Sequence, residues 1–264
     1  MNNDLFNMDM PQGPSDTDPV RRAQVQSNLP FPKRFYNAVA VVERNGQFAV
    51  ELDGKRVKTP ARQDLLLPNR ALAQMIADEF AAQDKDIVPA RMPATRLANT
   101  AIDGIVSDPQ VVLEDVLRFA SSDMLCYRAG SPERLVKRQT DLWDPIIDWA
   151  ASDLGARFVL AEGVMHVEQP RETLAALGVH LGQFRDAFTV AALHTITTLT
   201  GSAILALAVA KGRITGDEAW MLAHVDEDWT IEQWGEDAEA SARRALRERE
   251  MVAAVKVLQA IAAS

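Results

Sequence analysis

The run AWMLAHVDEDWTIEQWGEDAE occupies residues 219–239 and holds three of the five tryptophans in this chain of 264 residues. Within residues 226–239, seven side chains are acidic and none is Lys or Arg. Thr215, followed by Glu218, has the pattern of a capping box, in which each residue binds the backbone of the other. The pattern predicts a helix over residues 217–233.

At about 100° per residue, such a helix carries Trp220, Glu227 and Trp234 on one stripe and Trp229 on the opposite side. An ordinary surface helix has one apolar face, so large aromatic side chains on both sides need another explanation. We expect that the helix is either buried between other elements or presents one aromatic side to a partner. Burying the Glu227 carboxylate alone between tryptophans would be costly, so it needs a cation from this chain or another.

The composition excludes several classes of function. The chain is 47% hydrophobic and 25% charged, as is usual for a soluble globular protein. Its net charge of -9 argues against nucleic acid or an anionic membrane as the main partner. The single cysteine, Cys126, excludes an internal disulfide and fits a reducing, intracellular setting. We expect Cys126 to be a buried core thiol.

The N-terminal residues lack the basic start and apolar core of a secretory signal, and their aspartates speak against a mitochondrial transit peptide. We expect residues 1–31 to form a disordered tail. Residues 188–210 carry no formal charge and are long enough to cross a bilayer. Five threonines and His194 dilute this run, and Gly201 divides it, so we predict two consecutive core helices and no membrane insertion.

Turn signals and periodicity divide the chain into a mixed part and a helical part. The pairs Asn45-Gly46 and Asp53-Gly54 between β-rich runs predict an antiparallel unit of three or four strands. A helix capped by Asn69 follows, and a second helix is predicted over residues 95–106. The break at Asp108-Pro109 marks a domain boundary. We therefore predict an α+β fold, with a small N-terminal antiparallel β unit and its helices followed by a larger all-α orthogonal helical domain. The expected domains are 32–108 and 109–264.

Three local features are predicted within the helical part. Asp144-Pro145 should kink or restart a helix that begins near Glu133. Residues 158–167 are expected to form a small hairpin around Glu162-Gly163. Asp123 and Arg128 are interpreted as a structural ion pair or as caps, with contact to a partner as the alternative.

Motifs for catalysis and cofactor binding are absent from the sequence. It has no phosphate-binding loop, no G-x-S-x-G and no H-E-x-x-H. His224, Glu227 and Asp228 share helical spacing, but a metal site would need a further ligand, so we expect no metal and no cofactor. The acids in 226–239 form a solvated face, act as general acids and bases, or bind arginine on a partner. Tryptophans among them favour the partner, because Trp is enriched at interface hot spots.

Several segments in order carry a resemblance to a known family. They are LDGKRVKTP (52–60), RMPATRLANTAID (91–103), DMLCYR (123–128), ERLVKRQTDLWDPIIDWA (133–150) and DEDWTIEQWGED (226–237). Together they are similar to the assembly chaperones of F-type ATP synthase that act on the α subunit. The resemblance extends over roughly residues 34–250.

The resemblance implies a non-enzymatic chaperone that binds the free α subunit and shields its β-facing interface until assembly. It also implies a small α/β domain on a helical domain, and an important acid shortly after Trp234-Gly235. Here that acid corresponds to Glu236, with Asp237 and Glu239 as near alternatives. Many members carry Trp where this chain has Phe80. The expected partner-binding residues are therefore Glu236, Asp237, Glu239, Glu227, Trp234, Trp220 and Phe80.

Two other classes of function remain open from the residues. One is a hydrolase or lyase with carboxylates around Glu227 and Asp237, which a cleft joining several acids to a histidine would favour. The other is a scaffold whose acidic face meets a basic partner. An open aromatic surface rimmed by acids would favour the chaperone. Eukaryotic members carry a mitochondrial presequence that this chain lacks, so we expect a bacterial cytoplasmic protein, and a monomer.

Overall fold

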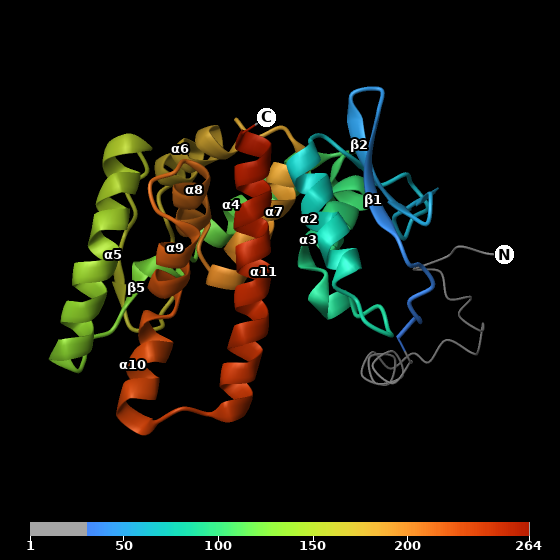
Figure 1. Cartoon of the computed structure of the whole chain (residues 1–264). Helices are drawn as coiled ribbons and strands as arrows, with labels where there is room; N and C mark the ends of the chain where they lie inside the picture. The colour runs from blue at the N-terminus through green and yellow to red at the C-terminus, as the bar shows by residue number, and fades with distance from the viewer. Residues whose placement is uncertain (1–30, 264) are drawn as a thin grey trace, which may run out of the picture. The chain divides into compact units, whose positions relative to one another are not determined.

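The structure is a computed structural model that describes residues 31–263 (Figure 1). The predicted tail over residues 1–31 lies outside the described residues except for Phe31. The chain divides into two compact units, the first ending at Asp103 and the second beginning at Gly104. This division falls shortly before the Asp108-Pro109 pair at which the sequence indicates a boundary.

The first unit is built on a four-stranded antiparallel sheet. Strand β2 (Gln47–Leu52) pairs with β1 (Val39–Arg44), β3 (Lys55–Arg56) and β4 (Leu66–Leu67). Asn45 and Gly46 join β1 to β2 with φ of 53° and 78°, the left-handed conformations that a two-residue type I′ turn requires. The prediction of three or four antiparallel strands is therefore confirmed.

Helices cover this sheet and complete the first core. Helix α2 (Arg70–Ala81) packs on β1 and β2 and is followed by η1 (Pro89–Arg91) and α3 (Pro93–Thr100). Asn69 caps α2 as predicted, since its side chain accepts a hydrogen bond from the Leu72 N–H at 2.8 Å. After α3 the backbone continues as a π-helical turn, η2 (Ala101–Ile105), rather than as the α-helix predicted to residue 106.

The second unit is mainly helical, which confirms the predicted α+β fold with a larger helical part. Its helices are α4 (Pro109–Ala120), η3 (Met124–Cys126), α5 (Glu133–Asp153), α6 (Arg171–Leu181), α7 (Ala187–Thr200), α8 (Ala203–Ala210), α9 (Gly216–Ala223), α10 (Val225–Trp234) and α11 (Ala238–Ala262). Two short strands, β5 (Tyr127–Arg128) and β6 (Ala161–Glu162), accompany them.

Helix α8 forms the centre of this core. Its residues 203–208 are all buried, and it packs against α4, α5, α7 and α9. Gly201, with φ of 70°, ends α7, and the Ser202 side chain caps α8 by accepting from the Leu205 N–H. The apolar run 188–210 thus divides into two core helices, as predicted. Within the described range, no helix combines the length and apolar character needed to span a bilayer.

The predicted hairpin over residues 158–167 is wrong. Strand β6 pairs in parallel with β5, with Ala161 opposite Tyr127. The Gly163 N–H donates to the Arg128 carbonyl at 2.8 Å, so the glycine attaches this segment to β5 instead of turning it back on itself.

Helix α5 runs through Pro145 without restarting. A proline inside a helix leaves the carbonyl of the residue four positions earlier without its N–H partner. Here that residue, Asp141, is exposed, so water can satisfy the carbonyl. The adjacent Asp144 forms an ion pair with Arg128 at 2.8 Å.

The predicted pair of Asp123 with Arg128 does not form, but the alternative role of Asp123 as a cap is confirmed. The buried Asp123 carboxylate accepts from the Leu125 N–H at 3.2 Å and from the Ile204 N–H at 3.1 Å. It thereby caps η3 and binds the first turn of α8. Burial raises the pKa of Asp123 to about 6, despite these hydrogen bonds.

Candidate functional site

The acid-rich run 219–239 is divided among three helices at one end of the second unit (Figure 1). The predicted capping box is confirmed: the Glu218 N–H donates to Thr215 Oγ1 at 3.1 Å, and the Glu218 carboxylate accepts from the Thr215 N–H at 2.7 Å. The prediction of one helix over 217–233 is wrong, because α9 ends at Ala223 and α10 begins at Val225.

His224 is the residue at which the helix breaks. Its Nδ1 lies 2.7 Å from the Trp220 carbonyl, the acceptor that the His224 backbone N–H would bind in a continuous helix. That N–H donates instead to the Met221 carbonyl. The side chain therefore replaces the backbone as the partner of Trp220, which ends α9.

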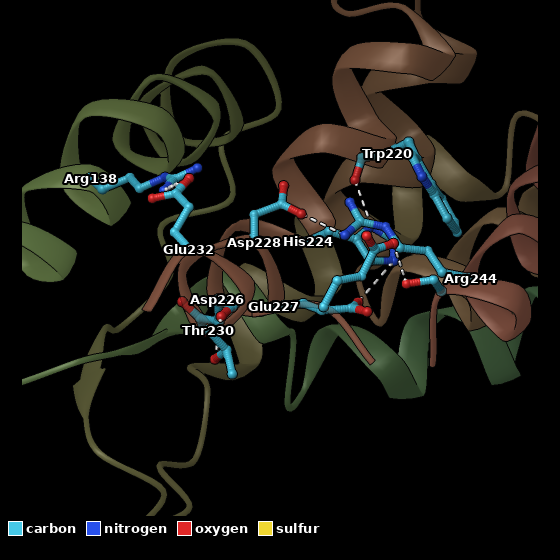
Figure 2. Close-up of polar contacts among 11 residues, drawn as sticks. Arg138, Trp220, His224, Asp226, Glu227, Asp228, Thr230, Glu232 and Arg244 are labelled. Carbon is cyan, nitrogen blue, oxygen red and sulfur yellow. Dashed lines mark hydrogen bonds and ion pairs between the residues drawn. The ribbon is translucent and has the colours of Figure 1, made fainter. Parts of the chain in front are cut away.

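The imidazole of His224 is buried and stacks against the Trp220 indole (Figure 2). Burial lowers the pKa of His224, which favours the neutral ring. A neutral ring that donates from Nδ1 to the carbonyl presents Nε2 as an acceptor. This Nε2 lies 3.8 Å from the Glu227 carboxylate.

The break removes the predicted stripe of Trp220, Glu227 and Trp234. Trp220 is buried, whereas Trp234, the last residue of α10, is 79% exposed. Trp229 is half-buried, and the Glu227 side chain is 40% exposed, so its carboxylate is not enclosed between tryptophans. The open aromatic side of the run is therefore Trp234 alone.

Most acids of the run already have partners within the chain. Asp228 pairs with Arg244, and Glu232 pairs with Arg138 at 2.7 Å (Figure 2). Glu239 pairs with Arg243, and Asp226 accepts from Gln139 Nε2 at 2.7 Å. Burial by itself would lower the pKa of Arg244, but its bond to Asp228 and the charges of Asp228, Glu227 and Glu248 raise it. The contacts of Asp226 and Glu232 join α10 to α5, the pair of Asp228 with Arg244 joins α10 to α11, and the pair of Glu239 with Arg243 lies within α11.

Glu227 and Glu236 are the exceptions. Among residues 31–263, no Lys or Arg forms an ion pair with either carboxylate. Glu227 faces the neutral His224, and Glu236 accepts a hydrogen bond from the Ser241 hydroxyl. Glu236 is thus available to a cation from outside the chain, and Glu227, whose charge already acts on Arg244, forms no ion pair that would prevent such binding.

The connection between α10 and α11 presents Glu236 to solvent. Gly235 has φ of 90°, a conformation that L side chains rarely adopt, and it redirects the chain directly after Trp234. Asp237 then caps α11, because its carboxylate accepts from the Ala240 N–H at 2.7 Å. Glu236, Asp237 and Glu239 are all exposed.

Two of the predicted partner-binding residues are not accessible in this structure. Phe80 has no exposed surface and packs edge-on against Tyr36 in the first unit. Trp220 is 7% exposed and lines a cavity of about 310 Å³ between α9 and α11, together with Asp217, Glu248 and Lys256. Neither side chain can offer a broad surface to a partner without rearrangement.

The geometry offers little to acid–base or metal chemistry. Glu227 and Asp237 do not line the cavity between α9 and α11, and the carboxylate of Asp237 is occupied as a helix cap. Over the described residues, no group of three or more His, Cys, Asp or Glu side chains is placed to hold a metal ion. Burial raises the pKa of Cys126 to about 12, so its thiol stays protonated. The site is an open acidic surface that carries one exposed indole.

Sequence reasoning missed the internal partners of the acids. Gln139 and Arg138 lie on α5, and Arg244 lies on α11, so no local spacing connects them with α10. The absence of Lys and Arg within 226–239 means that an internal cation has to come from outside that run, and Arg243, four residues after Glu239, is the one partner at local spacing among these pairs.

Comparisons with known proteins agree with one another. A family model described as ATP12 chaperone protein matches residues 33–151, a range that ends before the acidic surface. The chain is 24% identical over 233 residues to Protein atp12, mitochondrial, of Schizosaccharomyces pombe, a match that covers 81% of this chain and 79% of that protein.

Solved structures match over nearly the whole chain. A protein from Agrobacterium tumefaciens that is described as a proposed chaperone is 57% identical, with a TM-score of 0.85, over 98% of this chain and 96% of that chain. Atp12 from Paracoccus denitrificans is 39% identical, with a TM-score of 0.78, over 86% of this chain and 97% of that chain. An aspartate-to-lysine mutant of the Paracoccus protein matches with the same TM-score and 38% identity.

Proposed function

This chain belongs to the ATP12 chaperone family, and we propose that it binds the free α subunit of the F-type ATP synthase and shields its β-facing interface during assembly. Membership rests on relatives that are 39% identical over 97% of their own length, together with the family model. We further propose that it acts as a monomer in a bacterial cytoplasm; the bacterial origin of the solved relatives supports the bacterial setting.

The observation that carries the proposal is the exposed carboxylate of Glu236, two residues after the exposed indole of Trp234 in the sequence. An unassembled α subunit exposes an apolar interface, and the family resemblance implies an arginine on it that faces the β subunit. A carboxylate that is preorganised on an exposed surface pairs well with arginine, and the indole covers apolar surface beside it. Glu227, which also forms no ion pair with Lys or Arg among the described residues, supplies a second carboxylate on α10.

The same geometry supports a non-enzymatic role. The acids serve as ion-pair partners, as a helix cap or as open surface groups, and they do not converge on a nucleophile. We therefore propose that the chain uses binding energy alone, without nucleotide hydrolysis. The hydrolase or lyase alternative is not favoured by any observation.

The test uses the purified chain with isolated α subunit. We expect stoichiometric suppression of α-subunit aggregation, measured by light scattering without ATP, and a complex in sedimentation velocity. Glu43→Lys, at an exposed acid on β1, is the matched charge-reversal control and should behave as the wild type. A strict requirement for ATP, or the absence of a complex, would overturn the proposal.

A further inference from the structure

The segment between α5 and α6 exposes an unusual density of apolar side chains. Val159 is 41% exposed, Leu160 43%, Val164 94% and Met165 77%. Isolated exposed apolar residues are normal, but clusters of them mark interaction surfaces. We call residues 159–165 the apolar loop.

Polar contacts hold the apolar loop in place, rather than burial of its apolar side chains. The Gln169 side chain, which is 4% exposed, accepts from the Val159 N–H at 2.8 Å and donates to the Val159 carbonyl at 2.9 Å. Farther along, the Gly163 N–H donates to the Arg128 carbonyl at 2.8 Å. Pairing of β6 with β5 adds a further attachment within the loop. The backbone is therefore fixed while the apolar side chains remain in water.

Such an arrangement is suited to binding. Ordering a loop on association has a free-energy cost, which a preorganised loop largely avoids. Removing apolar surface from water is favourable in proportion to the area removed. A partner that covers these aliphatic side chains therefore gains binding free energy. Met165 adds an unbranched, polarisable side chain that adapts to irregular apolar surfaces.

A buried glutamine connects the apolar loop to the acidic surface. The Ala129 N–H, directly after β5, donates to Gln139 Oε1 at 2.8 Å. Gln139 Nε2 donates in turn to the Asp226 carboxylate in the first turn of α10 at 2.7 Å. Gln139 is 2% exposed, so its side chain is shielded from water, whereas Asp226 at the far end of the link is exposed. The strand that holds the loop and the helix that carries the acids are thus joined through one side chain.

We propose that the apolar loop is a second part of the client-binding surface, which covers apolar assembly surface of the α subunit while the acids bind its cationic side chain. This inference rests on the proposed function. The charge of the chain favours this occupant over two others. A second copy or an anionic membrane would bring negative charge toward a chain whose net charge is already -9.

The test compares two variants in binding to purified α subunit. The double variant Val164→Ser, Met165→Ser removes the two most exposed apolar side chains of the loop. Val179→Ser, at a 68% exposed position on α6, is the matched control. We expect binding about tenfold or more weaker for the double variant, as for a hot spot, and unchanged for the control. Thermal melting should be unchanged for both, since the replaced side chains are exposed.

A photoreactive amino acid at position 165, with position 179 as control, provides a second readout. We expect position 165 alone to crosslink to the α subunit. Wild-type affinity in the double variant would overturn this inference and leave the proposed function intact. Failure of the wild-type chain to bind the α subunit would overturn both. If the double substitution instead abolished self-association in sedimentation velocity, the loop would belong to an interface between copies and the inference would be wrong.

Discussion

The imidazole of His224 lies against the indole of Trp220, with ring centroids 3.9 Å apart, at the break between α9 and α10. The same imidazole binds the Trp220 carbonyl and faces the Glu227 carboxylate. One buried side chain thus ends α9, packs on its neighbour and sets where α10 begins. The acidic surface depends on this break, because a continuous helix would direct its second half elsewhere.

The first prediction concerns the pH dependence of stability. Burial lowers the pKa of folded His224, whereas the unfolded chain returns to about 6.5, so the unfolded state binds more protons below that pH. The stabilisation of the fold by neutral His224 is therefore fully present above about pH 6.5. It is lost as the pH falls toward the folded pKa. We expect His224→Asn, which does not titrate, to lose stability less steeply than the wild type between pH 7 and 5. The slopes of unfolding free energy against pH should differ between the two proteins by at most about 1.4 kcal/mol per pH unit.

Urea denaturation at each pH measures this difference. His166→Asn, at an exposed histidine, is the matched control and should retain the wild-type pH dependence. Identical slopes for the wild type and His224→Asn would show that His224 does not titrate differently in the folded and unfolded states.

The position of this break could not be predicted from the sequence, although much of the fold could. The Asn45-Gly46 turn and the Thr215–Glu218 capping box were predicted correctly because each depends on residues close in sequence. The break at His224 depends on competition between a side chain and a backbone N–H for one carbonyl, which periodicity does not reveal. The pairing of β6 with β5 joins segments too far apart for a local signal.

The same limit applies to the candidate site. Glu236, which the resemblance marks shortly after Trp234-Gly235, is exposed, and Gly235 with φ of 90° redirects the chain just before it. Glu232 forms an ion pair with Arg138, 94 positions away in the sequence. No local pattern could indicate this pair before the fold was known. Phe80, a partner-binding position inferred from resemblance alone, is fully buried in this structure.

The second prediction concerns Trp143, which is fully buried in α5. Its Nε1–H donates to the Leu222 carbonyl at 2.9 Å, and the Arg128 guanidinium lies 5.3 Å from the ring centroid. Trp143→Ala should lower the free energy of unfolding by about 3–5 kcal/mol through the cavity that it leaves. Trp143→Phe should cost about 1–3 kcal/mol, because it leaves the Leu222 carbonyl unpaired. Chemical denaturation measures both.

Trp234→Phe is the matched control for Trp143, since Trp234 is 79% exposed. It should change the free energy of unfolding by no more than about 0.5 kcal/mol. Equal costs at positions 143 and 234 would contradict the assignment of Trp143 to the core.

The third prediction concerns the ion pair between Arg244 and Asp228, whose side chains are 22% and 28% exposed. It joins the first half of α11, which is largely exposed, to α10. A double-mutant cycle with Arg244→Met and Asp228→Asn should give a coupling free energy of about 1 kcal/mol, since partial exposure screens the charges. Hydrogen exchange in residues 238–246 should become faster in Arg244→Met. A coupling energy of zero would mean that the pair does not hold α11 against α10.

The last prediction separates binding from folding at two adjacent acids. Asp237 caps α11 through the Ala240 N–H, whereas Glu236 binds only the Ser241 hydroxyl. Asp237→Lys should therefore lower stability by about 1 kcal/mol, because it removes the cap and places a positive charge at a helix N-terminus. Glu236→Lys keeps the cap and places its charge one residue farther from the helix, so it should lower the melting temperature less than Asp237→Lys. If Glu236 pairs with arginine on the α subunit, its reversal should weaken binding about 30-fold, since losing one partner of such a pair costs about 2 kcal/mol or more.

Asp237→Asn completes the test, because asparagine caps a helix as well as aspartate but carries no charge. Isothermal titration with α subunit, alongside thermal melting, measures all three variants. Weaker binding by Glu236→Lys with wild-type binding by Asp237→Asn would assign the contact to Glu236, and the reverse would assign it to Asp237. Suppose instead that joint reversal of Glu236, Asp237 and Glu239 leaves the affinity unchanged. The acids after Trp234 would then be a solvated face, and the cationic partner would have to bind Glu227, which forms no ion pair with Lys or Arg among residues 31–263.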